Sequence, residues 1–486
     1  MARKPFLILL ASLAAVASAA PAGETRPPNF VVIFTDDLGY GDLGSYGHPS
    51  IRSPRLDAMA AEGIRFTDFY VASSVCTPSR AALLTGRLPI RSGMAGQLTH
   101  RVLYADSTGG LPLEEITMAT ALREAGYATA LIGKWHLGNP PEFSPLRHGF
   151  DYYFGIPYSN DMELDRNRNP PPRPAFRLDA DYEWWDVPLM RNHTIIERPA
   201  NQHTLTKRYT EESIRFIREN RDSPFLLHLW HTFPHVPLFA SEKFHGRSPR
   251  GRYGDTVEEI DWSTGQILDT LRELGLAENT LVVFTSDNGP WLTRDVAGGS
   301  AGLLRDGKGS TFEGGVRVPA IAWWPGRVEA GVVSREMANA MDLFTTFLKL
   351  AGAKIPPDRV IDGVDMRPIL LKNGAGRRNV EYYFRSDRLY AIRKGPFKAH
   401  YSTWPGYSPE EAEHHDPPLL YHLGHDPSER FNIADDHPEV IAAIHAVRDS
   451  FLDELVPGEP QLTDGHFRGR WEVPEGIEIR LENAAP

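Results

Sequence analysis

Four short runs of apolar, mostly β-branched or aromatic residues constrain the fold of this chain more than any other feature. They occupy residues 29–34, 128–132, 225–227 and 281–284. Their length and composition are typical of strands that are buried on both faces. Amphipathic helical patterns lie between them, over residues 54–62 and 260–274. Strands and helices that alternate in this way predict an α/β fold, with a large, mostly parallel sheet flanked by helices.

Polar side chains suited to chemistry follow each of these strands at its downstream end. They are Asp36 and Asp37, then Lys134 and His136, then His231 and His235, and finally Asp287 and Asn288. In open α/β sheets, functional sites form at the carboxyl ends of the strands. Four such coincidences predict one shared cleft.

The pattern of the sequence changes from about residue 378. Residues 380–384 and 389–393 alternate in the way that antiparallel strands do. Apolar residues at helical spacing over 438–455 predict a packed last element. We therefore expect a catalytic domain over 21–377 and a smaller C-terminal subdomain over 378–486, built from an antiparallel sheet and a helix.

The beginning of the chain has the layout of a cleavable secretory signal, which we assign to residues 1–20. Arg3 and Lys4 precede an apolar stretch over 6–16, and small residues at 17–19 offer a cleavage site. The stretch is too short to span a bilayer comfortably. No cysteine lies near the cleavage point, so no lipid anchor is expected. We expect an exported protein, periplasmic or secreted, with no membrane anchor.

The formal net charge of −11 argues against nucleic acid or an anionic membrane surface as a general partner. An anionic substrate would therefore need local positive charge. A segment rich in Pro, Asp and Arg, residues 160–199, is expected to form a long surface excursion near the cleft, where it could shape specificity or be decoration.

The chain has a single cysteine, Cys76, so no internal disulfide can form, although the export signal implies a compartment where disulfides persist. For an isolated cysteine, burial as a small apolar side chain is the common explanation. The context of Cys76 argues otherwise. Pro78 and the helix formers before Gly86 predict a helix that begins at Cys76. There the free backbone donors favour an anion, either a thiolate or the group that is attacked.

Two glycine-rich patterns resemble nucleotide-binding motifs and fail on their context. Residues 39–44 match GxGxxG after a strand, but residues 45–49 would break the helix that this fingerprint must open. Residues 302–309 resemble a phosphate-binding loop, but Gly309 stands where a Ser or Thr would bind magnesium. Neither pattern predicts a nucleotide site.

Residues 76–80, Cys-Thr-Pro-Ser-Arg, resemble the signature of the type I sulfatases, in which the cysteine is oxidised to formylglycine. The chain is also similar to the arylsulfatase A and N-acetylgalactosamine-6-sulfatase group over residues 36–42, 133–138, 285–290 and 306–315. The resemblance extends from residue 29 to about residue 432. It implies an alkaline-phosphatase-like fold, and a maturation enzyme, formylglycine-generating or equivalent, as a partner.

The acidic residues suggest a metal site. Asp36, Asp37, Asp287 and the amide oxygen of Asn288 offer hard oxygen ligands suited to Ca²⁺ or, less well, Mg²⁺. Adjacent acids can also simply cap helices or turns. The resemblance implies one calcium ion, with residue 76 as a further ligand. Such an ion can hold an oxygen of the nucleophile and an oxygen of the sulfate together.

The resemblance further implies how residue 76 works. As formylglycine it forms an aldehyde hydrate, with two hydroxyls on one carbon. One hydroxyl attacks sulfur, the ester alcohol leaves, and a sulfated enzyme forms. Loss of the proton of the second hydroxyl then expels sulfate and restores the aldehyde. A serine has only one hydroxyl, so its sulfate ester would need attack by water.

Charged residues complete the expected site. Arg80 adds a fixed positive charge one turn along the helix from Cys76. Lys134 and His136 are two apart in an expected extended segment, so both would face the cleft while Trp135 points away. By resemblance, Lys134 contacts the sulfate and His136 assists the second hydroxyl of the hydrate.

The leaving group needs a proton donor or a cation nearby. By resemblance, His235 and Lys308 supply these and contact the substrate, and Ser159 contacts the bound sulfate. His231 and Arg317 are expected to be structural, Arg317 through a salt bridge.

We therefore expect hydrolysis of an aryl or carbohydrate sulfate monoester, with a sulfated small molecule or glycan as substrate. Two alternatives stay open. One is a phosphate or phosphonate monoester hydrolase on the same scaffold, although a two-metal phosphatase would want further Asp and His ligands. The other is a sulfated-glycan-binding protein that is never matured. Animal members of the family carry several disulfides and this chain can form none, which favours a bacterial origin.

Overall fold

The computed structural model describes residues 26–482, so the predicted signal at 1–20 lies outside the described residues. Its centre is an eleven-stranded sheet in the order β11-β2-β10-β9-β1-β8-β4-β5-β6-β7-β17. The strands are β1 (Asn29–Thr35), β2 (Ile64–Phe66), β4 (Ala128–Gly133), β5 (Tyr152–Gly155), β6 (Leu189–Arg191), β7 (Thr194–Glu197), β8 (Phe225–Trp230), β9 (Thr280–Ser286), β10 (Ala320–Trp323), β11 (Val332–Ser334) and β17 (Glu478–Ile479). The five neighbours β9, β1, β8, β4 and β5 run parallel, and antiparallel pairs flank them. The predicted mostly parallel sheet is confirmed.

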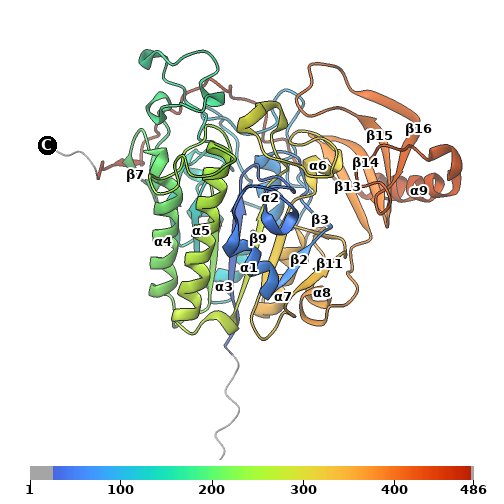
Figure 1. Cartoon of the computed structure of the whole chain (residues 1–486), viewed down its shortest axis with the longest axis horizontal. Helices are drawn as coiled ribbons and strands as arrows, with labels where there is room; N and C mark the ends of the chain where they lie inside the picture. Colours follow the sequence, from blue (N-terminus) through green and yellow to red (C-terminus); the bar gives the residue numbers. More distant parts are fainter. Residues whose placement is uncertain (1–25, 483–486) are drawn as a thin grey trace, which may run out of the picture.

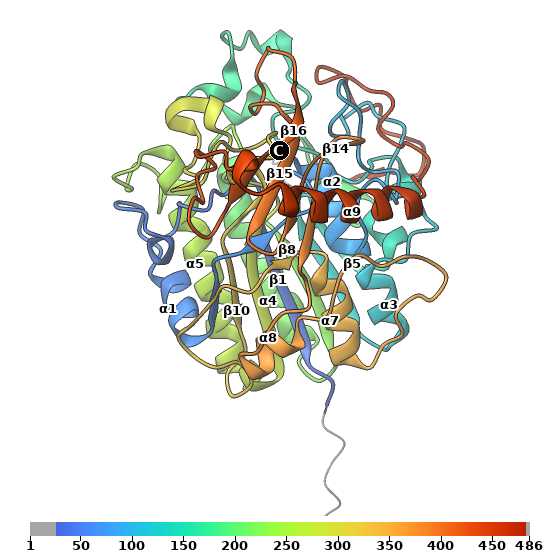
Figure 2. The same ribbon diagram turned by 90° about the vertical axis from the view of Figure 1, so that its right-hand side faces the viewer.

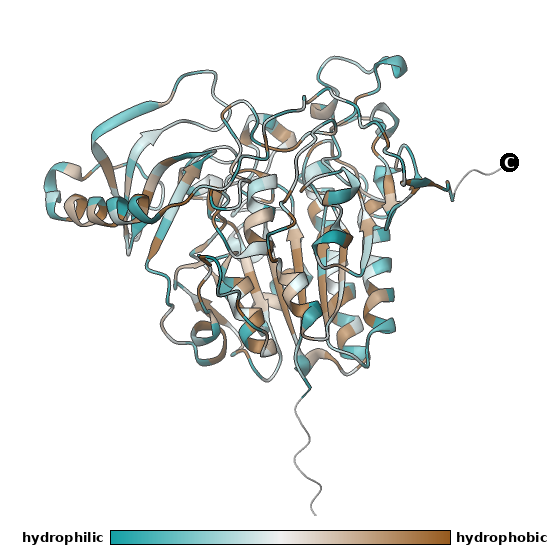
Figure 3. Cartoon of the chain, turned by 180° about the vertical axis from the view of Figure 1, so that it is seen from behind, coloured by the Kyte–Doolittle hydropathy of each residue, from teal (hydrophilic) through white to brown (hydrophobic). Residues whose placement is uncertain are grey.

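The four predicted strands form the middle of this sheet as β1, β4, β8 and β9. Val32 of β1 lies opposite His228 of β8 on one side and Val283 of β9 on the other. All seven residues of β1 are buried. Figure 3 shows the strands of the large sheet as mostly hydrophobic along their length. They are apolar on both faces because helices cover both sides of the sheet.

Nine helices lie within residues 26–482, and most of them pack around the large sheet. They are α1 (Pro54–Glu62), α2 (Cys76–Thr85), α3 (Met118–Glu124), α4 (Leu205–Glu219), α5 (Arg252–Glu273), α6 (Glu313–Val316), α7 (Asp342–Ala351), α8 (Arg367–Lys372) and α9 (Pro438–Glu454). Helices α4 and α5 pack side by side (Figure 1). Figure 2 shows α1 and α5 on one side of β1 and β8, and α3 and α7 on the other. The main hydrophobic core lies between the sheet and these two layers.

Two predicted helices show how well periodicity locates an element. Helix α1 has the predicted bounds, with Pro54 at its first position. Helix α5 begins at Arg252, two turns before the predicted start at residue 260. Its first turn contains Asp255, whose carboxylate accepts hydrogen bonds from the backbone of Gly246, Arg247 and Ser248. A buried acid that holds the preceding loop does not show in an apolar pattern.

A four-stranded sheet lies toward the end of the chain. It is antiparallel and contains β13 (Val380–Arg385), β14 (Arg388–Lys394), β15 (Phe397–Thr403) and β16 (Glu413–His422). Helix α9 packs against it, with the Phe451 ring stacked 4.0 Å from the Tyr382 ring. The smaller antiparallel sheet with its helix is therefore confirmed, while the division of the chain at residue 377 stays a prediction.

The expectation that this helix is the last element is wrong. After α9 the chain returns across the molecule to β7, which lies on the side far from α9 (Figure 1). The Gly458 N–H donates to Ile90 O at 2.9 Å, and the Trp471 N–H donates to Glu163 Oε1 at 2.7 Å. Strand β17 then pairs in parallel with β7 at the edge of the large sheet.

The segment 160–199 is only in part the predicted surface excursion. Met162 and Trp185 are buried, and β6 and β7 extend the large sheet. Between Met162 and Trp185, residues 164–184 form an outer loop with three short 3₁₀ helices, η4 (Arg166–Arg168), η5 (Pro174–Phe176) and η6 (Tyr182–Trp184). Composition alone could not predict that the two ends of this segment are buried, because Pro and Arg dominate it.

Within residues 26–482, we find no helix that combines the length and apolar character needed to cross a bilayer.

Candidate active site

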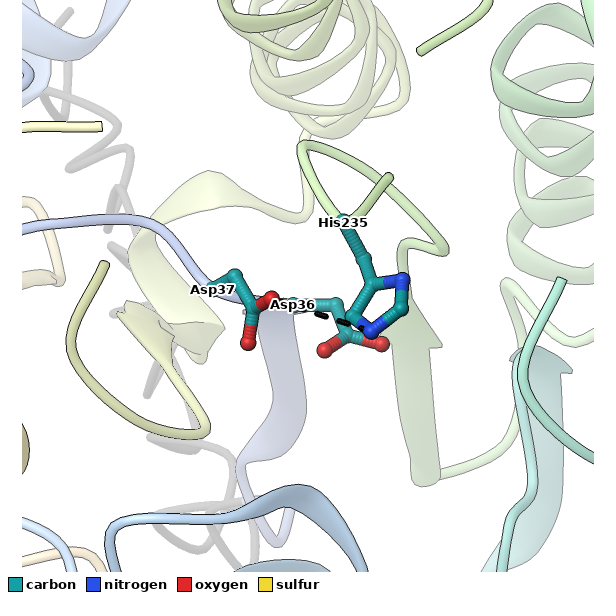
Figure 4. Close-up of side chains that lie close together, drawn as sticks. All are labelled: Asp36, Asp37 and His235. Carbon is teal, nitrogen blue, oxygen red and sulfur yellow. Dashed lines mark ion pairs between the residues drawn. The ribbon is translucent and has the colours of Figure 1, made fainter. Parts of the chain in front are cut away.

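Most of the polar residues predicted to meet at one edge of the sheet do so, whereas the His231 side chain contacts α5 instead. Asp36 and Asp37 follow β1, and Asp287 and Asn288 follow β9, its neighbour. The Asp37 N–H donates to Asp287 Oδ1 at 3.2 Å, and Asn288 Nδ2 donates to Asp37 Oδ1 at 2.7 Å. Figure 4 shows His235, from the segment after β8, pointing at Asp36 and Asp37. Parallel neighbouring strands bring these ends together.

This cluster fits a hard cation. The ligand atoms of Asp36, Cys76 and Asp287 lie within 4.8 Å of one another, as do those of Asp36, Asp37 and His235. Two oxygens of the cluster, Asp36 Oδ1 and Asn288 Oδ1, are buried and have no hydrogen-bond partner among residues 26–482. Buried oxygens are normally satisfied. Carboxylate and amide oxygens left free in one place suit a divalent cation such as Ca²⁺ or Mg²⁺.

Arg80 balances the negative charge of this cluster from the side of α2. Its Nε and Nη2 donate to Asp287 Oδ2 at 3.1 and 2.8 Å, and Nη2 lies 3.3 Å from Asp36 Oδ2. Its Nη1 donates to Lys134 O at 2.9 Å. The side chain is fully buried, with the guanidinium 5.2 Å from the centre of the Trp230 ring. Arg80 therefore fixes two of the acidic side chains in position.

Helix α2 begins at Cys76, as predicted, and Val75 before it provides no side-chain cap. Cys76 itself is only 2% exposed. Burial raises the pKa of its thiol to about 12. The thiol is therefore protonated at neutral pH, and of the two anions considered at this helix terminus, the thiolate is disfavoured.

Lys134 joins the cluster from the end of β4. Its Nζ contacts Asp36 Oδ2 and lies 3.2 Å from Ser159 Oγ. Burial alone would raise the pKa of Asp36, but the charges of Lys134 and the neighbouring cations outweigh it and lower this pKa. Asp36 is therefore ionised.

His136 differs from its prediction. Strand β4 ends at Gly133, and His136 has a φ of +60°, so the segment is not extended. The imidazole Nε2 lies 2.8 Å from Leu103 O, while Nδ1 is buried without a partner among residues 26–482. Burial and the nearby Lys134 hold the pKa of His136 well below its usual range, so the ring is neutral. Trp135 points away into the core, as predicted, and stacks 6.2 Å from Trp230.

His235 and Lys308 flank Asp37. Lys308 Nζ lies 2.7 Å from Asp37 Oδ1, and His235 Nε2 lies 3.7 Å from Asp37 Oδ2. His235 Nδ1 lies 2.5 Å from Val236 O and 3.2 Å from Asn160 Oδ1. Because the Val236 carbonyl can only accept, we assign the ring proton to Nδ1, which leaves Nε2 facing the cluster. Burial and the charge of Lys308 lower the pKa of His235 well below its usual range.

The two residues expected to be structural lie in separate contacts. His231 is buried, with Nε2 3.4 Å from Ser263 Oγ on α5. Arg317 pairs with Asp68 at 2.9 Å and with Glu313 at 3.3 Å. The salt bridge expected for Arg317 is confirmed.

Three residues next to the site were not predicted. Asn160 is held by Gln202 at 2.9 Å and in turn contacts His235. The Trp291 ring lies 5.4 Å from the His235 ring and 5.1 Å from that of Tyr407. Asn160 and Trp291 directly follow segments that the sequence singled out, and this adjacency could have identified them. Tyr407 comes from the loop between β15 and β16, and only the tertiary fold brings it here.

Comparison with known proteins identifies the family. Residues 28–353 match the family described as Sulfatase, and residues 376–476 match the C-terminal region of aryl-sulfatase. The chain is 43% identical over 490 residues to N-acetylgalactosamine-6-sulfatase of Mus musculus, which covers 95% of this chain and 92% of the relative. It is 44% identical over 455 residues to arylsulfatase A of Homo sapiens, which covers 88% of each chain.

A solved structure agrees with these relatives. The PsFucS1 sulfatase from Pseudoalteromonas sp. is 31% identical, with a TM-score of 0.77 and coverage of 89% of this chain and 92% of that one. The alkaline-phosphatase-like fold expected from the resemblance is confirmed. The chain therefore belongs to the sulfatase family, in the group of arylsulfatase A and N-acetylgalactosamine-6-sulfatase, and is an enzyme that hydrolyses sulfate esters.

Proposed function

We propose that this enzyme cleaves aryl or carbohydrate sulfate monoesters with formylglycine, made from Cys76, as its nucleophile and one calcium ion as its cofactor. The proposed ligands are Asp36, Asp37, Asp287, Asn288 and residue 76. One observation carries the proposal: the two free buried oxygens, on Asp36 and Asn288, belong to the acidic cluster that faces the first residue of α2.

The two groups would supply complementary chemistry. A bound calcium ion offsets the negative charge of the sulfate and holds it close to the nucleophile. Formylglycine, as its hydrate, offers a pair of hydroxyls on one carbon. Arg80 keeps Asp287 and Asp36 in place for this task, since its guanidinium contacts both carboxylates.

Lysines surround the position where the sulfate would bind. We assign sulfate binding to Lys134 and Lys308, whose ammonium groups contact Asp36 and Asp37 respectively. Ser159, within hydrogen-bond distance of Lys134, adds a hydroxyl donor. Preorganised cations stabilise negative charge that develops during reaction more effectively than water does.

The two histidines and Lys308 are assigned to proton transfer and to the leaving oxygen. The free Nδ1 of His136 is the proposed acceptor for the proton of the second hydroxyl, a role that requires the neutral imidazole found here. His235 and Lys308 are the proposed partners of the leaving oxygen, and the Lys308 ammonium supplies the positive charge and the proton, because Nε2 of the neutral His235 ring carries none. Asn160 orients His235 through Nδ1, so that Nε2 faces the reacting groups.

The number of metal sites favours a sulfatase over a two-metal phosphatase. The two groups of potential ligands found in residues 26–482 share Asp36, so they outline one centre. A phosphate or phosphonate monoester hydrolase with two metal ions would need a second set of ligands.

Export to the periplasm or outside the cell, and maturation by a formylglycine-generating or equivalent enzyme, complete the proposal. Because Cys76 is 2% exposed, the maturation enzyme must act on it before the fold closes around α2.

Mass spectrometry of the peptide spanning residue 76, from the native host, tests the nucleophile. We expect loss of the thiol and gain of an aldehyde or its hydrate. Turnover of 4-nitrophenyl sulfate and 4-nitrophenyl phosphate then tests the reaction, with faster release from the sulfate expected. Faster phosphate release would support the phosphatase alternative, and a persistent thiol without turnover would support a binding protein.

A further inference from the structure

A cavity of about 840 Å³ opens beside the cluster, on the side of Trp291 and Tyr407. Its volume lies within the range of pockets that hold small ligands, about 300–1,000 Å³. Trp291 lies between the acidic cluster and this cavity, because its ring lies 5.4 Å from the His235 ring and also lines the cavity. A substrate whose ester reaches the cluster would therefore extend into this cavity.

Aromatic rings form much of the cavity wall. They belong to Tyr104, Phe176, Trp185, Trp291, Tyr407 and Phe467. These side chains come from five separate parts of the chain, including the outer loop 164–184 with Trp185 next to it and the tail after α9. Flat apolar surfaces with a few polar groups favour a ring-shaped ligand, such as a sugar presented by its C–H face.

The charged groups of the cavity are almost all positive. The cavity is lined by four arginines and a single carboxylate, that of Asp161; the arginines are Arg166, Arg173, Arg294 and Arg468. Nearby arginines outside the lining are paired, Arg168 with Glu183 and Arg470 with Asp165. A local excess of positive charge in a chain of net charge −11 marks this cavity as a site for an anion.

Arg294 is the best placed of these cations. Its guanidinium carbon lies 3.6 Å from the centre of the Trp291 ring and 3.9 Å from that of Phe176. With two aromatic rings this close, the guanidinium donates best from its edge, the geometry that carboxylate and sulfate accept in pairs. Its Nε is buried and has no hydrogen-bond partner within residues 26–482.

Lys308 relates this position to the reacting ester. Its ammonium lies 4.4 Å from the centre of the same Trp291 ring that Arg294 covers. Arg294 and Lys308 therefore both lie over one aromatic ring, so an anion at Arg294 and the sulfate expected at Lys308 would be near each other. One sugar, or two linked sugars, can carry both groups.

We infer that Arg294 binds a second anionic group of the substrate, so that the preferred substrates are saccharides carrying a sulfate or carboxylate besides the sulfate ester that is cleaved. The inference rests on the proposed function for the position of the cleaved ester. It makes Arg294 a specificity-determining residue and Trp291 the platform between the two anionic groups.

Binding without turnover tests the inference. In the Cys76→Ala background, calorimetry would compare monosulfated galactose, galactosamine and fucose, each with its disulfated form and with a uronate-linked form. We expect the dissociation constant to be about 10- to 100-fold lower for a dianionic member than for its monosulfated partner, as for a charged hydrogen-bonded pair. A gain from the disulfate but not the uronate would assign the second group as sulfate, and the reverse would assign it as carboxylate.

Adding Arg294→Gln should abolish this preference, and Arg294→Lys should restore part of it. Arg327→Gln is the matched control, because Arg327 also lies over a tryptophan, Trp324, at 5.9 Å, but does not line the cavity. The inference is overturned if no dianionic member binds at least tenfold more tightly, or if the preference survives Arg294→Gln. Failure of sulfate release by the unsubstituted enzyme would instead count against the proposed function.

Discussion

Arg80 donates two hydrogen bonds to the same carboxylate oxygen of Asp287, from Nε at 3.1 Å and from Nη2 at 2.8 Å. Both side chains are fully buried. This pair links α2, which presents residue 76, to the end of β9, and so joins the two parts of the site.

Arg80→Ala should destabilise the protein, because it leaves Asp287 buried without its paired cation and Asp36 with Lys134 alone. We expect a loss of about 3–5 kcal/mol in the free energy of unfolding, measured in urea. Arg80→Lys keeps the charge but not the fork of donors, so its loss should be smaller. The surface variant Arg327→Ala should stay close to the parent. An Arg80→Ala protein of parental stability would contradict the role assigned to this pair.

Calcium should raise the melting temperature of the unsubstituted protein, because an ion bound only by the folded state stabilises it. Asn288→Leu removes one of the two free buried oxygens and should abolish most of this rise. Scanning calorimetry with calcium, with magnesium and with a chelator provides the measurement. If calcium left the melting temperature of the unsubstituted protein unchanged, the ligand set would be wrong.

Cys76→Ala should reduce sulfate release to below about one thousandth of the parent rate, since it removes the nucleophile. The substitution shortens one small buried side chain, so the fold should lose no more than about 1–2 kcal/mol. Turnover and urea unfolding of the same preparation separate the two effects. Turnover within tenfold of the parent would mean that residue 76 is not the nucleophile.

Glu259 on α5 should make stability fall as the pH rises. Its Oε2 accepts the Ser241 N–H at 2.9 Å, and burial raises its pKa from 4.5 to about 7. The folded state therefore binds the proton more tightly than the unfolded chain does. Stability is lost between about pH 4.5 and pH 7, by up to about 3 kcal/mol.

Glu259→Gln should remove this slope, so the variant gains stability relative to the parent as the pH rises from 4 to 8. Urea unfolding at several pH values measures the difference. Glu258→Gln, the half-buried neighbour, controls for the loss of a charge on α5. Equal pH dependence of the parent and Glu259→Gln would refute the assignment.

Local pattern was enough to predict the centre of the fold. Strand β1 and helix α1 have nearly the predicted bounds, because each buries a continuous or periodic apolar surface. Strands β6, β7 and β17 were not predicted. They are short, and β17, with only two residues, pairs with β7, which lies far away in the sequence. Such short strands are defined by their partner, which a local pattern does not contain.

The residues of the site also fall into those that the sequence could predict and those that it could not. Asp36, Asp37, Asp287 and Asn288 could be predicted because each directly follows a recognisable strand. The backbone turn at His136 could not, since its positive φ depends on neighbours such as Thr77, whose hydroxyl donates to His136 O at 3.0 Å. Arg294 and Tyr407 lie in loops whose position only the complete fold determines.

The path of the tail after α9 sets an order in which the enzyme can be completed. Phe467 and Arg468 belong to this tail, and both line the cavity beside Trp291. A growing chain that folds from its first domain onward can form the acidic cluster long before these residues have been synthesised. The nascent enzyme therefore holds its catalytic groups early and gains a finished substrate wall only when residues 457–482 have emerged.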